Sequence, residues 1–338
     1  MRIAEMNLVI LTRQFGTYTG ATVSTIELLK RIYCYFNRVV IVTMRSELEE
    51  FSNVEIVLVK DRKHLQLSLD EIVQNDGEWV GYSDDHLGWM LKESRVPYIH
   101  TYHGNWPDVR YLNAEMFLKS FYFIPQYKRT IVGAEISVSV SKYMKSKFVD
   151  NYSKKSEVIY NGVLQTGGTS KKKKSRRIMM IGNVDRRKYS LAIKLFNEFK
   201  GESIPPIDIY GSIIDHKIGK RLSGFPFVNL MGKKSYIDFN SYSRLLSTSS
   251  CENLPVSIVE ALLQELPVIS FDVGGIGEVV TKDNGEIIPL NDFSLMRNKL
   301  LSNRVYPFEG EELLKEKFNW DYSAKKYMEL FKKIGMKD

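Results

Sequence analysis

Cysteine is scarce in this chain, which has only Cys34 and Cys251 among its 338 residues. The two are far apart and form no Cys-x-x-Cys pair, which excludes a cysteine zinc site and a disulfide framework. Isolated thiols are typical of a protein in a reducing compartment. We therefore expect two reduced cysteines, no bound metal and a cytoplasmic protein.

Long apolar stretches are also missing. The first run, "MNLVIL", has six residues and follows Glu5, so it does not predict a signal peptide. No stretch approaches the ~20 apolar residues that cross a bilayer. Any membrane contact would lie on the surface, so the alternative to a purely cytoplasmic location is a peripheral one on the inner face of the membrane.

The dinucleotide-binding fingerprint is absent too, because residues 13–29 lack the Gly-x-Gly-x-x-Gly pattern. Gly16 and Gly20 nevertheless stand between the first apolar run and the first helical pattern. Glycine at such a turn lets the backbone come close to a ligand. A plain connection between strand and helix is the alternative.

The composition is otherwise that of a globular protein, with 43% hydrophobic and 26% charged residues. The length fits two domains of about 150 residues each. The formal net charge of +8 favours anionic partners such as nucleic acid, acidic lipid or phosphorylated ligands. Charge alone does not choose among them.

Short apolar runs alternate with helical patterns in both halves of the chain. In the first half the runs are at 7–11, 39–43, 54–59, 97–102, 135–141 and 157–160, and in the second at 177–182, 207–211, 227–232, 267–271 and 285–290. Helical patterns occupy 22–36, 189–199 and 256–265, and the chain ends in another. This alternation predicts βαβ units and parallel sheets.

Residues 163–176 are rich in Gly, Ser, Thr and Lys and predict a linker. The predicted domains cover 1–162 and 177–317, with a terminal helix at 318–338. Two such α/β domains imply a cleft between them, with ligands at the carboxyl ends of the strands.

The segment 247–290 carries the strongest chemical pattern. Glu252 precedes a helix that Pro255 suits as a first-turn residue, and Glu260 lies inside that helix. A carboxylate there can accept hydrogen bonds from a ribose diol, and the amides of Asn253, Leu254 and Val256 at the helix start suit a phosphate. An amphipathic helix with two solvated glutamates is the alternative.

The same segment resembles the signature of glycosyltransferase family 4, a GT-B family with two Rossmann-like domains. The matching residues are Ser249, Glu252, Glu260, Ala261, Pro267, Val268, Gly274, Gly275, Glu278, Asn284 and Gly285. The resemblance implies that Glu260 holds the donor ribose, and that Glu252 and the amides through Val256 contact the donor sugar and phosphates. Asn253-Leu254-Pro255 replaces the family's usual Gly-Phe-Gly, which leaves the donor sugar open.

A second match is "MIGNVDRRKYS" at 180–190, where Lys188 aligns with the family lysine that clamps the diphosphate. Asn183 stands where the family has arginine, so the positive charge of that arginine is missing. We expect Arg186 or Arg187 to supply it instead. Fixed cations stabilise the charge that gathers on a leaving diphosphate. A basic loop on a basic protein is the alternative.

A third match is His103-Gly104 in "YIHTYHGNW", which resembles the family's His-Gly beside the donor sugar. Gly16 and Gly20 resemble its glycine loop, with Ala21 in place of the second glycine. A histidine capping a strand is the plainer explanation of His103. The other histidines, His64, His86 and His216, have no such support.

The resemblance spans nearly the whole chain and implies a retaining glycosyltransferase of the hexosyltransferase class. The implied attack is on the front face, and the terminal helix is expected to pack on the first domain. The donor would be a nucleotide diphosphate sugar bound by the second domain, and the N-terminal domain, 1–162, would bind the acceptor. The acceptor would be a glycan, free, lipid-linked or protein-linked, in the synthesis of a cell-surface glycan or polysaccharide. No Asp-x-Asp occurs in the sequence, so we expect neither a metal nor another cofactor.

Two other functions remain open. A non-catalytic GT-B subunit would bind glycans or a partner, although joint retention of His103, Lys188, Glu252 and Glu260 argues against it. A nucleic-acid-binding protein could use the basic run at 171–177, but that run has no nearby stacking aromatics. We therefore expect no nucleic-acid partner.

Residues 115–130 mix aromatic and basic side chains, as a membrane-surface helix does. They include Phe117, Leu118, Phe121, Tyr122, Phe123 and Ile124 together with Lys119, Lys128 and Arg129. An anionic membrane is the partner that this pattern indicates, and a buried helix with a charged edge is the alternative.

Overall fold

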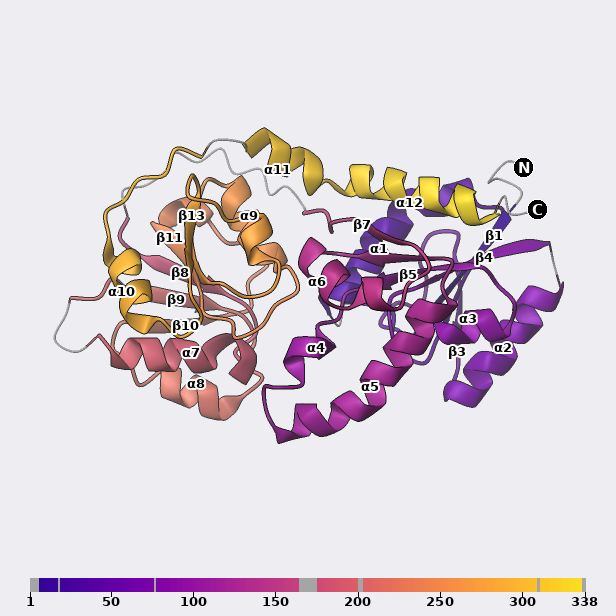
Figure 1. Cartoon of the computed structure of the whole chain (residues 1–338), viewed down its shortest axis with the longest axis horizontal. Helices are drawn as coiled ribbons and strands as arrows, with labels where there is room; N and C mark the ends of the chain where they lie inside the picture. The colour runs from indigo at the N-terminus through magenta and orange to yellow at the C-terminus, as the bar shows by residue number, and fades with distance from the viewer. Residues whose placement is uncertain are drawn as a thin grey trace. The chain divides into compact units, whose positions relative to one another are not determined.

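The computed structural model describes residues 6–17, 19–75, 77–163, 175–199, 203–308 and 311–335 (Figure 1). The chain divides into two compact units. Unit 1 consists of Met1–Gly162 with Lys317–Asp338, and unit 2 of Val163–Glu316. The linker predicted at 163–176, including most of its basic run, lies almost entirely outside the described residues.

The described part of unit 1 holds a seven-stranded parallel sheet in the order β3-β2-β1-β4-β5-β6-β7. Its strands are β1 (Met6–Thr12), β2 (Val39–Thr43), β3 (Glu55–Leu58), β4 (Glu78–Ser83), β5 (Tyr98–Tyr102), β6 (Ile136–Ser139) and β7 (Ser156–Val158). Its helices are α1 (Gly20–Ile32), α2 (Arg62–Asn75), α3 (Trp89–Glu93), α4 (Trp106–Val109), α5 (Ala114–Gly133), α6 (Lys142–Lys147) and α12 (Trp320–Gly335), with short 3-10 turns η2 (Tyr33–Tyr35) and η3 (Val149–Asn151).

Both faces of this sheet are buried, as continuous apolar runs require in parallel sheets. Strand β1 is buried along its whole length. Leu8 and Ile10 pack in a core with residues of α1 and α12, whereas Val9 and Leu11 pack in a second core with residues of α2 and α3. Side chains two apart share a face, so one strand serves both cores.

Strand order changes direction at β1 and β4, which are neighbours in the sheet. Strands β2 and β3 lie on one side of β1, and β4 to β7 on the other. Loops leaving two such strands diverge to opposite faces, and ligands bind in the crevice at their carboxyl ends. The carboxyl ends of β1 and β4 are therefore where a site is expected in unit 1.

The terminal helix α12 is built into unit 1, where it lies beside α1 (Figure 1). A Cβ on Gly162 would come within 2.3 Å of the Trp320 ring, so glycine is required under that indole. Ser323 donates to the Tyr160 carbonyl, and the hydroxyls of Tyr327 and Thr101 lie 2.8 Å apart. A segment more than 150 residues away in sequence thus completes the first core.

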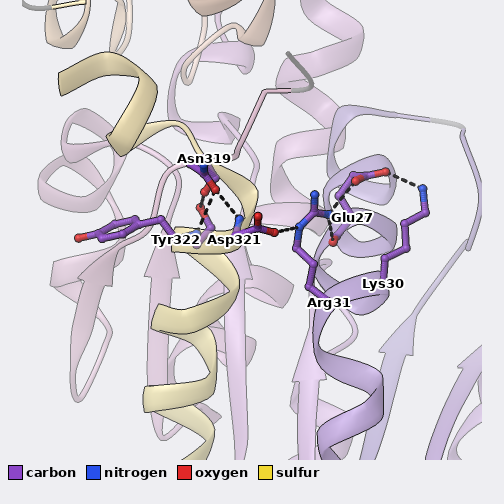
Figure 2. A network of polar contacts seen from close by, with 7 residues as sticks. Glu27, Lys30, Arg31, Asn319, Asp321 and Tyr322 are labelled. Atoms are coloured by element: carbon purple, nitrogen blue, oxygen red, sulfur yellow. Dashed lines mark hydrogen bonds and ion pairs between the residues drawn. The ribbon is translucent and has the colours of Figure 1, made fainter. Parts of the chain in front are cut away.

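Figure 2 shows the polar contacts between α1 and α12. Arg31 donates to both Asp321 and Glu27, and Lys30 pairs with Glu27 at 2.7 Å. The Glu27 side chain is only 8% exposed, so these two cations compensate a carboxylate removed from water. Burial alone would raise the pKa of Glu27, but the hydrogen bonds and charges of Lys30 and Arg31 hold it below the ordinary value.

The described part of unit 2 holds a six-stranded parallel sheet in the order β10-β9-β8-β11-β12-β13. Its strands are β8 (Ile178–Ile181), β9 (Ile207–Tyr210), β10 (Val228–Gly232), β11 (Arg244–Ser247), β12 (Val268–Phe271) and β13 (Gly285–Ile288). Its helices are α7 (Arg186–Asn197), α8 (His216–Leu222), α9 (Val256–Leu263), α10 (Phe293–Leu301) and α11 (Glu311–Lys317), with turns η4 (Phe239–Ser241) and η5 (Ile276–Glu278). The switch point lies between β8 and β11.

The predicted fold class, two Rossmann-like parallel-sheet domains of the GT-B type, is confirmed. Each half, however, has one strand more than the sequence indicated, and these are the switch strands β4 and β11. Spacings of three and four in the sequence place Val23 on the same apolar face of α1 as Ile26 and Leu29, but Val23 is 37% exposed. Among the described helices, none combines the length and apolar character needed to span a bilayer.

Candidate active site

Two cations and a carboxylate meet at the switch point of unit 2. Arg187 Nη1 lies 2.9 Å from Glu252 Oε2, and Lys188 Nζ lies 3.3 Å from Glu252 Oε1. Ser249 donates to the same carboxylate at 2.8 Å. The cations stand in the first turn of α7, after β8, and Glu252 follows β11. We call Arg187, Lys188 and Glu252 the ion cluster.

The ion cluster is held in place by local structure. Asp185 caps α7 by accepting from the Lys188 amide at 2.9 Å, which orients the first turn. Ser250 and Thr248 bind the carbonyls of Arg187 and Lys188, so the loop after β11 is tied to the same turn. Each member of the cluster is therefore positioned by backbone contacts as well as by its charge.

Glu252 is buried, with a side chain 8% exposed. Burial on its own would raise the pKa of this carboxyl, but the positive charges of Lys188 and Arg187 hold it below its ordinary value. Glu252 is thus ionised at neutral pH, and the cluster carries one positive charge in excess. A buried site with excess positive charge attracts an anionic group such as a diphosphate.

Two glycines let the backbone pack closely against the ion cluster. Gly182, with φ of +141°, lies under Lys188, where a Cβ would stand 2.5 Å from Lys188 Cδ. Gly274, with φ of +63°, leaves only 1.9 Å between a Cβ and the Glu252 carbonyl oxygen. Both follow strand ends at the carboxyl edge of the sheet. Any other residue at either position would push the ion cluster apart or strain the backbone.

The other donor-side residues predicted from sequence lie in unit 2 around the same edge. Pro255 is the N-cap residue of α9, and Asn253 and Leu254 precede it. Asn253 is buried and its carbonyl accepts from the Gly275 amide at 2.6 Å. Glu260 lies in α9, and burial raises the pKa of its carboxyl. Asn183 and Arg186 are exposed, so of the two arginines considered, Arg187 is the one in the cluster.

Unit 1 has a cavity of about 250 Å³ at its own switch point. Its walls come from the loops after β1, β4 and β5, from the start of α1 and from α5. The lining residues are Thr12, Arg13, Gln14, Thr19, Ala21, Thr22, Asp84, Asp85, His86, His103, Gly104, Trp106, Phe123 and Tyr127.

One wall of the cavity is aromatic. The rings of Trp106 and Phe123 are stacked, with centroids 4.4 Å apart and an interplanar angle of 14°. His86 packs edge-on against Phe123 at 4.9 Å. Burial lowers the pKa of both His86 and His103, in the latter to about 4, so both rings are neutral at pH 7.

Two carboxylates, Asp84 and Asp85, also line the cavity. Asp84 is 4% exposed, and its Oδ2 accepts from Thr25 at 2.6 Å. Its Oδ1 has no hydrogen-bond partner among the described residues. Burial, reinforced by the neighbouring charge of Asp85, raises the pKa of Asp84 to about 7. Asp85 accepts from the backbone amides of Arg13 and Leu87, which joins the loops after β1 and β4.

The residues predicted in unit 1 are distributed around this cavity. His103 lines it, and Gly20 begins α1 between two lining residues, Thr19 and Ala21. Space beside Gly20 is open, since a Cβ there would meet nothing within 4 Å. Gly16 is different, because it packs on Glu47, whose Oε2 would be 2.8 Å from a Cβ. Its φ of +147° explains the glycine without a ligand.

Sequence reasoning missed Asp84, Asp85 and His86, which stand directly after β4. His86 was set aside as unsupported, yet it lies in the cavity wall. The feature of the sequence that could have indicated them is the acidic pair Asp84 and Asp85, directly after the segment 78–83. Without recognition of that segment as a strand, nothing placed the pair at a carboxyl edge.

Comparison with known proteins agrees with this architecture. Residues 81–164 match the family model described as Glycosyltransferase Family 4. An uncharacterized glycosyltransferase of Methanocaldococcus jannaschii is 28% identical over 260 residues, which cover 70% of this chain and 68% of that protein.

Solved structures share the fold across nearly the whole chain. HepE of Anabaena, crystallised in complex with UDP and glucose, superposes with a TM-score of 0.75 at 14% identity, covering 96% of this chain and 99% of that one. Sucrose-phosphate synthase of Thermosynechococcus elongatus gives a TM-score of 0.75 at 16% identity, covering 97% and 98%. With the family match and the curated relative, these likenesses show that the chain is a glycosyltransferase of the GT-B type that resembles glycosyltransferase family 4.

Proposed function

We propose that this enzyme transfers a sugar from a nucleotide diphosphate donor to an acceptor hydroxyl, with retention at the anomeric carbon and without a metal ion. The single observation that carries the proposal is the ion cluster, which places two cations at the switch point of unit 2. HepE, which shares the fold, was crystallised with UDP and with UDP-glucose, which supports a nucleotide sugar as donor. The product would belong to cell-surface glycan or polysaccharide synthesis.

The chemistry follows from where charge develops. The bond between the anomeric carbon and the diphosphate oxygen breaks, and the acceptor oxygen bonds to that carbon on the same face. The acceptor proton passes to a donor phosphate oxygen. Negative charge on the diphosphate increases as the bond breaks, so Arg187 and Lys188 stabilise the transition state more than the ground state. Retention rests on the family resemblance.

Catalysis should therefore survive chelation of divalent ions. Donor hydrolysis or transfer measured in EDTA is expected to keep most of the rate seen without it, because the two fixed cations would neutralise the diphosphate charge that a metal ion neutralises in other enzymes. Loss of turnover in EDTA that Mg²⁺ or Mn²⁺ restores would contradict the proposal. Thermal shifts with UDP, GDP and ADP on the same protein would identify the base, because a ligand that binds only the folded state raises the melting temperature.

Glu260→Ala is expected to weaken binding of the nucleoside diphosphate by ~1–3 kcal/mol, the effect of losing a charge-assisted hydrogen-bonding partner. The carboxyl is half-buried in α9, and burial raises its pKa, so donors from a ribose diol would stabilise its ionised form. Calorimetric titration measures the change, with exposed Glu198→Ala in the same unit as control. Equal affinity in a folded Glu260→Ala protein would remove Glu260 from the ribose site.

We propose, second, that unit 1 docks on an anionic membrane through the exposed side of α5. Leu118 and Phe121, three residues apart on α5, are 68% and 64% exposed, and Tyr111, shortly before the helix, is 75% exposed. Lys119 and Lys128 stand on the same helix. Phe123 lines the cavity instead, so the aromatic residues of this helix divide between a surface and a site.

Flotation with vesicles tests this docking. The chain is expected to float with phosphatidylglycerol vesicles at low salt, to float less at high salt, and to stay behind with phosphatidylcholine alone. Joint substitution of Leu118→Asp and Phe121→Asp should abolish flotation without unfolding the protein, since both side chains are exposed. Absence of flotation with acidic vesicles, or flotation that the double substitution leaves unchanged, would contradict membrane docking.

A further inference from the structure

Unit 2 has a cavity of about 90 Å³ at the edge of its sheet opposite the ion cluster. The cavity lies where β8 and β11 begin, and its lining also includes Pro205 before β9 and the residues at the end of α10. The ion cluster follows the ends of the same two strands. Since parallel strands all begin at one edge of the sheet and end at the other, the cavity is separate from the donor site.

Positive charge lines this cavity without a counter-charge. Its two charged lining residues are Arg176 and Arg244, and no carboxylate belongs to the lining that the structure describes. Neither arginine forms an ion pair with another described residue. Cations withdrawn from water are normally paired with an anionic group. An anion from solution would supply the missing partner.

Arg244 keeps hydrogen-bond donors available at the cavity. Its Nη1 donates to the carbonyls of Lys299 and Leu300, at 3.2 and 2.8 Å, and so compensates the negative end of α10. Its Nε and Nη2 have no hydrogen-bond partner among the described residues, and both nitrogens remain accessible to solvent. Burial lowers the pKa of Arg244, with only Tyr306 acting in the other direction. A bound anion would stabilise the charged form of this guanidinium.

Neutral donors and the small volume narrow the choice of ligand. Ser175 accepts from the Arg177 amide at 3.1 Å, which leaves its own hydroxyl proton to donate, and the exposed Asn303 also lines the cavity. Pockets that enclose whole drug-sized molecules measure about 300–1,000 Å³, so this cavity takes a group of only a few atoms. A phosphoryl group is of that kind, and its oxygens accept from guanidinium and hydroxyl donors.

We propose that this cavity is an anion site that binds one phosphoryl group, free or in a phosphomonoester, through Arg244 and Arg176. Arg244 supplies the partly buried guanidinium, and the exposed Arg176 reaches the ligand from the rim. The site is independent of the proposed nucleotide-sugar transfer, because it shares no residue with the ion cluster. Occupation would also stabilise unit 2, since a ligand that binds only the folded state favours folding.

Methyl NMR of the full chain reads the cavity directly, because Ile178, Leu300 and Leu301 line it. Inorganic phosphate and methyl phosphate would be titrated separately at neutral pH, with NaCl at equal ionic strength as the reference for screening. At least one of the two phosphates is expected to shift these methyl signals saturably, and the tighter one tells free phosphate from a phosphomonoester as the source. No saturable shift at the three residues, or an equal shift with NaCl, would overturn the proposal.

Substitutions assign the binding to the two arginines. Arg244→Gln should weaken the tighter phosphate roughly tenfold through loss of charge-assisted hydrogen bonds, and Arg176→Gln should weaken it several-fold. Arg221→Gln removes the same charge from an exposed residue of α8 and is the control, so its affinity should match that of wild type. Unchanged affinity in a folded Arg244→Gln protein, or an equal loss in Arg221→Gln, would overturn the assignment.

Arg176→Gln decides the question if Arg244→Gln fails to fold through loss of its contacts with α10. The Arg176 side chain makes no hydrogen bond or ion pair with the described residues, so its replacement should leave the fold intact. Wild-type affinity in the Arg176→Gln protein would then overturn the assignment.

The same spectra separate this inference from the proposed function. Leu254, two residues after Glu252, reports on the ion cluster, whereas Ile178 reports on the cavity. Phosphate that shifts Leu254 but not Ile178 would overturn the inference and leave the nucleotide-sugar proposal standing. Phosphate that shifts Ile178 in a protein that binds none of UDP, GDP and ADP would support the cavity site and contradict the nucleotide-sugar proposal alone.

Discussion

Lys188→Ala is expected to lower kcat by roughly 10²–10³-fold, the loss seen when one donor is removed from a charge-stabilising site. Lys188 is 17% exposed, lies over Gly182 and is paired with Glu252, so its ammonium is fixed before the donor arrives. A preorganised charge acts most when the leaving diphosphate is most negative. Asn183, which is exposed and uncharged, stands where the family has arginine. Stabilising the charge of the diphosphate therefore depends on Lys188 and Arg187.

The donor KM should rise less than kcat falls, because Arg187 still contributes to ground-state binding. Lys194→Ala, an exposed lysine on the same helix, is the matched control and should change kcat less than twofold. Steady-state kinetics with the donor identified by thermal shift provide the measurement. If kcat is unchanged in a folded Lys188→Ala protein, Lys188 is a structural partner of Glu252 and the charge-stabilising role passes to Arg187.

Asp84→Asn is expected to stabilise unit 1, and to do so increasingly as the pH rises. The carboxyl of Asp84 ionises in the unfolded chain near its ordinary pKa of 3.8, but in the folded unit its pKa is about 7. The folded state thus keeps a proton that the unfolded state releases, and it loses stability as the pH rises from about 4 through about 7. Asparagine has no proton to lose, so its advantage should grow by about 3 kcal/mol between pH 5 and pH 8.5.

The other titratable groups around Asp84 do not obscure its titration. They come from its own loop, from β4, from α5 and from α12: Asp85, Tyr82, Tyr127 and Tyr327. Burial raises the pKa of all three tyrosines, so they stay neutral across the range. The lowered pKa of His86 keeps that ring neutral at the upper end of the range.

Tryptophan fluorescence gives a readout confined to unit 1. The four tryptophans of the chain, Trp79, Trp89, Trp106 and Trp320, all belong to it. Urea unfolding followed in this way at pH 5, 7 and 8.5 would measure the difference between wild type and Asp84→Asn. Glu115→Gln, at an exposed carboxyl on α5, is the control and should show no pH-dependent gain. A constant difference across the three pH values would mean that Asp84 is not held protonated by the fold.

The burial of Asp84 bears on function. A buried carboxyl that weakens the fold at neutral pH is the kind of local inconsistency found at functional sites.

Local patterns in the sequence were sufficient for much of the fold. Short continuous apolar runs located eleven strands, because a buried parallel strand must be apolar on both faces. The resemblance to glycosyltransferase family 4, carried by Glu252, Glu260 and Lys188, implied the donor side, and these residues stand after strand ends and at helix starts, where local geometry sets their positions. These features depend on residues that are neighbours in the chain, so they can be recognised in the sequence itself.

Strands β4 and β11 were missed because tertiary contacts decide their composition. Gly81 interrupts β4, yet it is required there, since a Cβ would stand 2.8 Å from that of Tyr98 on the next strand. Arg244 begins β11 as a charged residue, but its Nη1 donates to the carbonyls of Lys299 and Leu300. Each residue lowers the strand propensity of its own segment. Its presence is explained only by its contact with residues that are distant in sequence.

The sequence by itself therefore indicated the two α/β units, the family resemblance, and Lys188 and Glu252 of the ion cluster. Only the tertiary structure decided that Arg187 rather than Arg186 pairs with Glu252, and that Asp84 lines a cavity with His103 and Trp106. The physical reason is that strand order is non-local. The hydrogen bonds that insert β4 between β1 and β5 bring together loops that no spacing in the sequence connects.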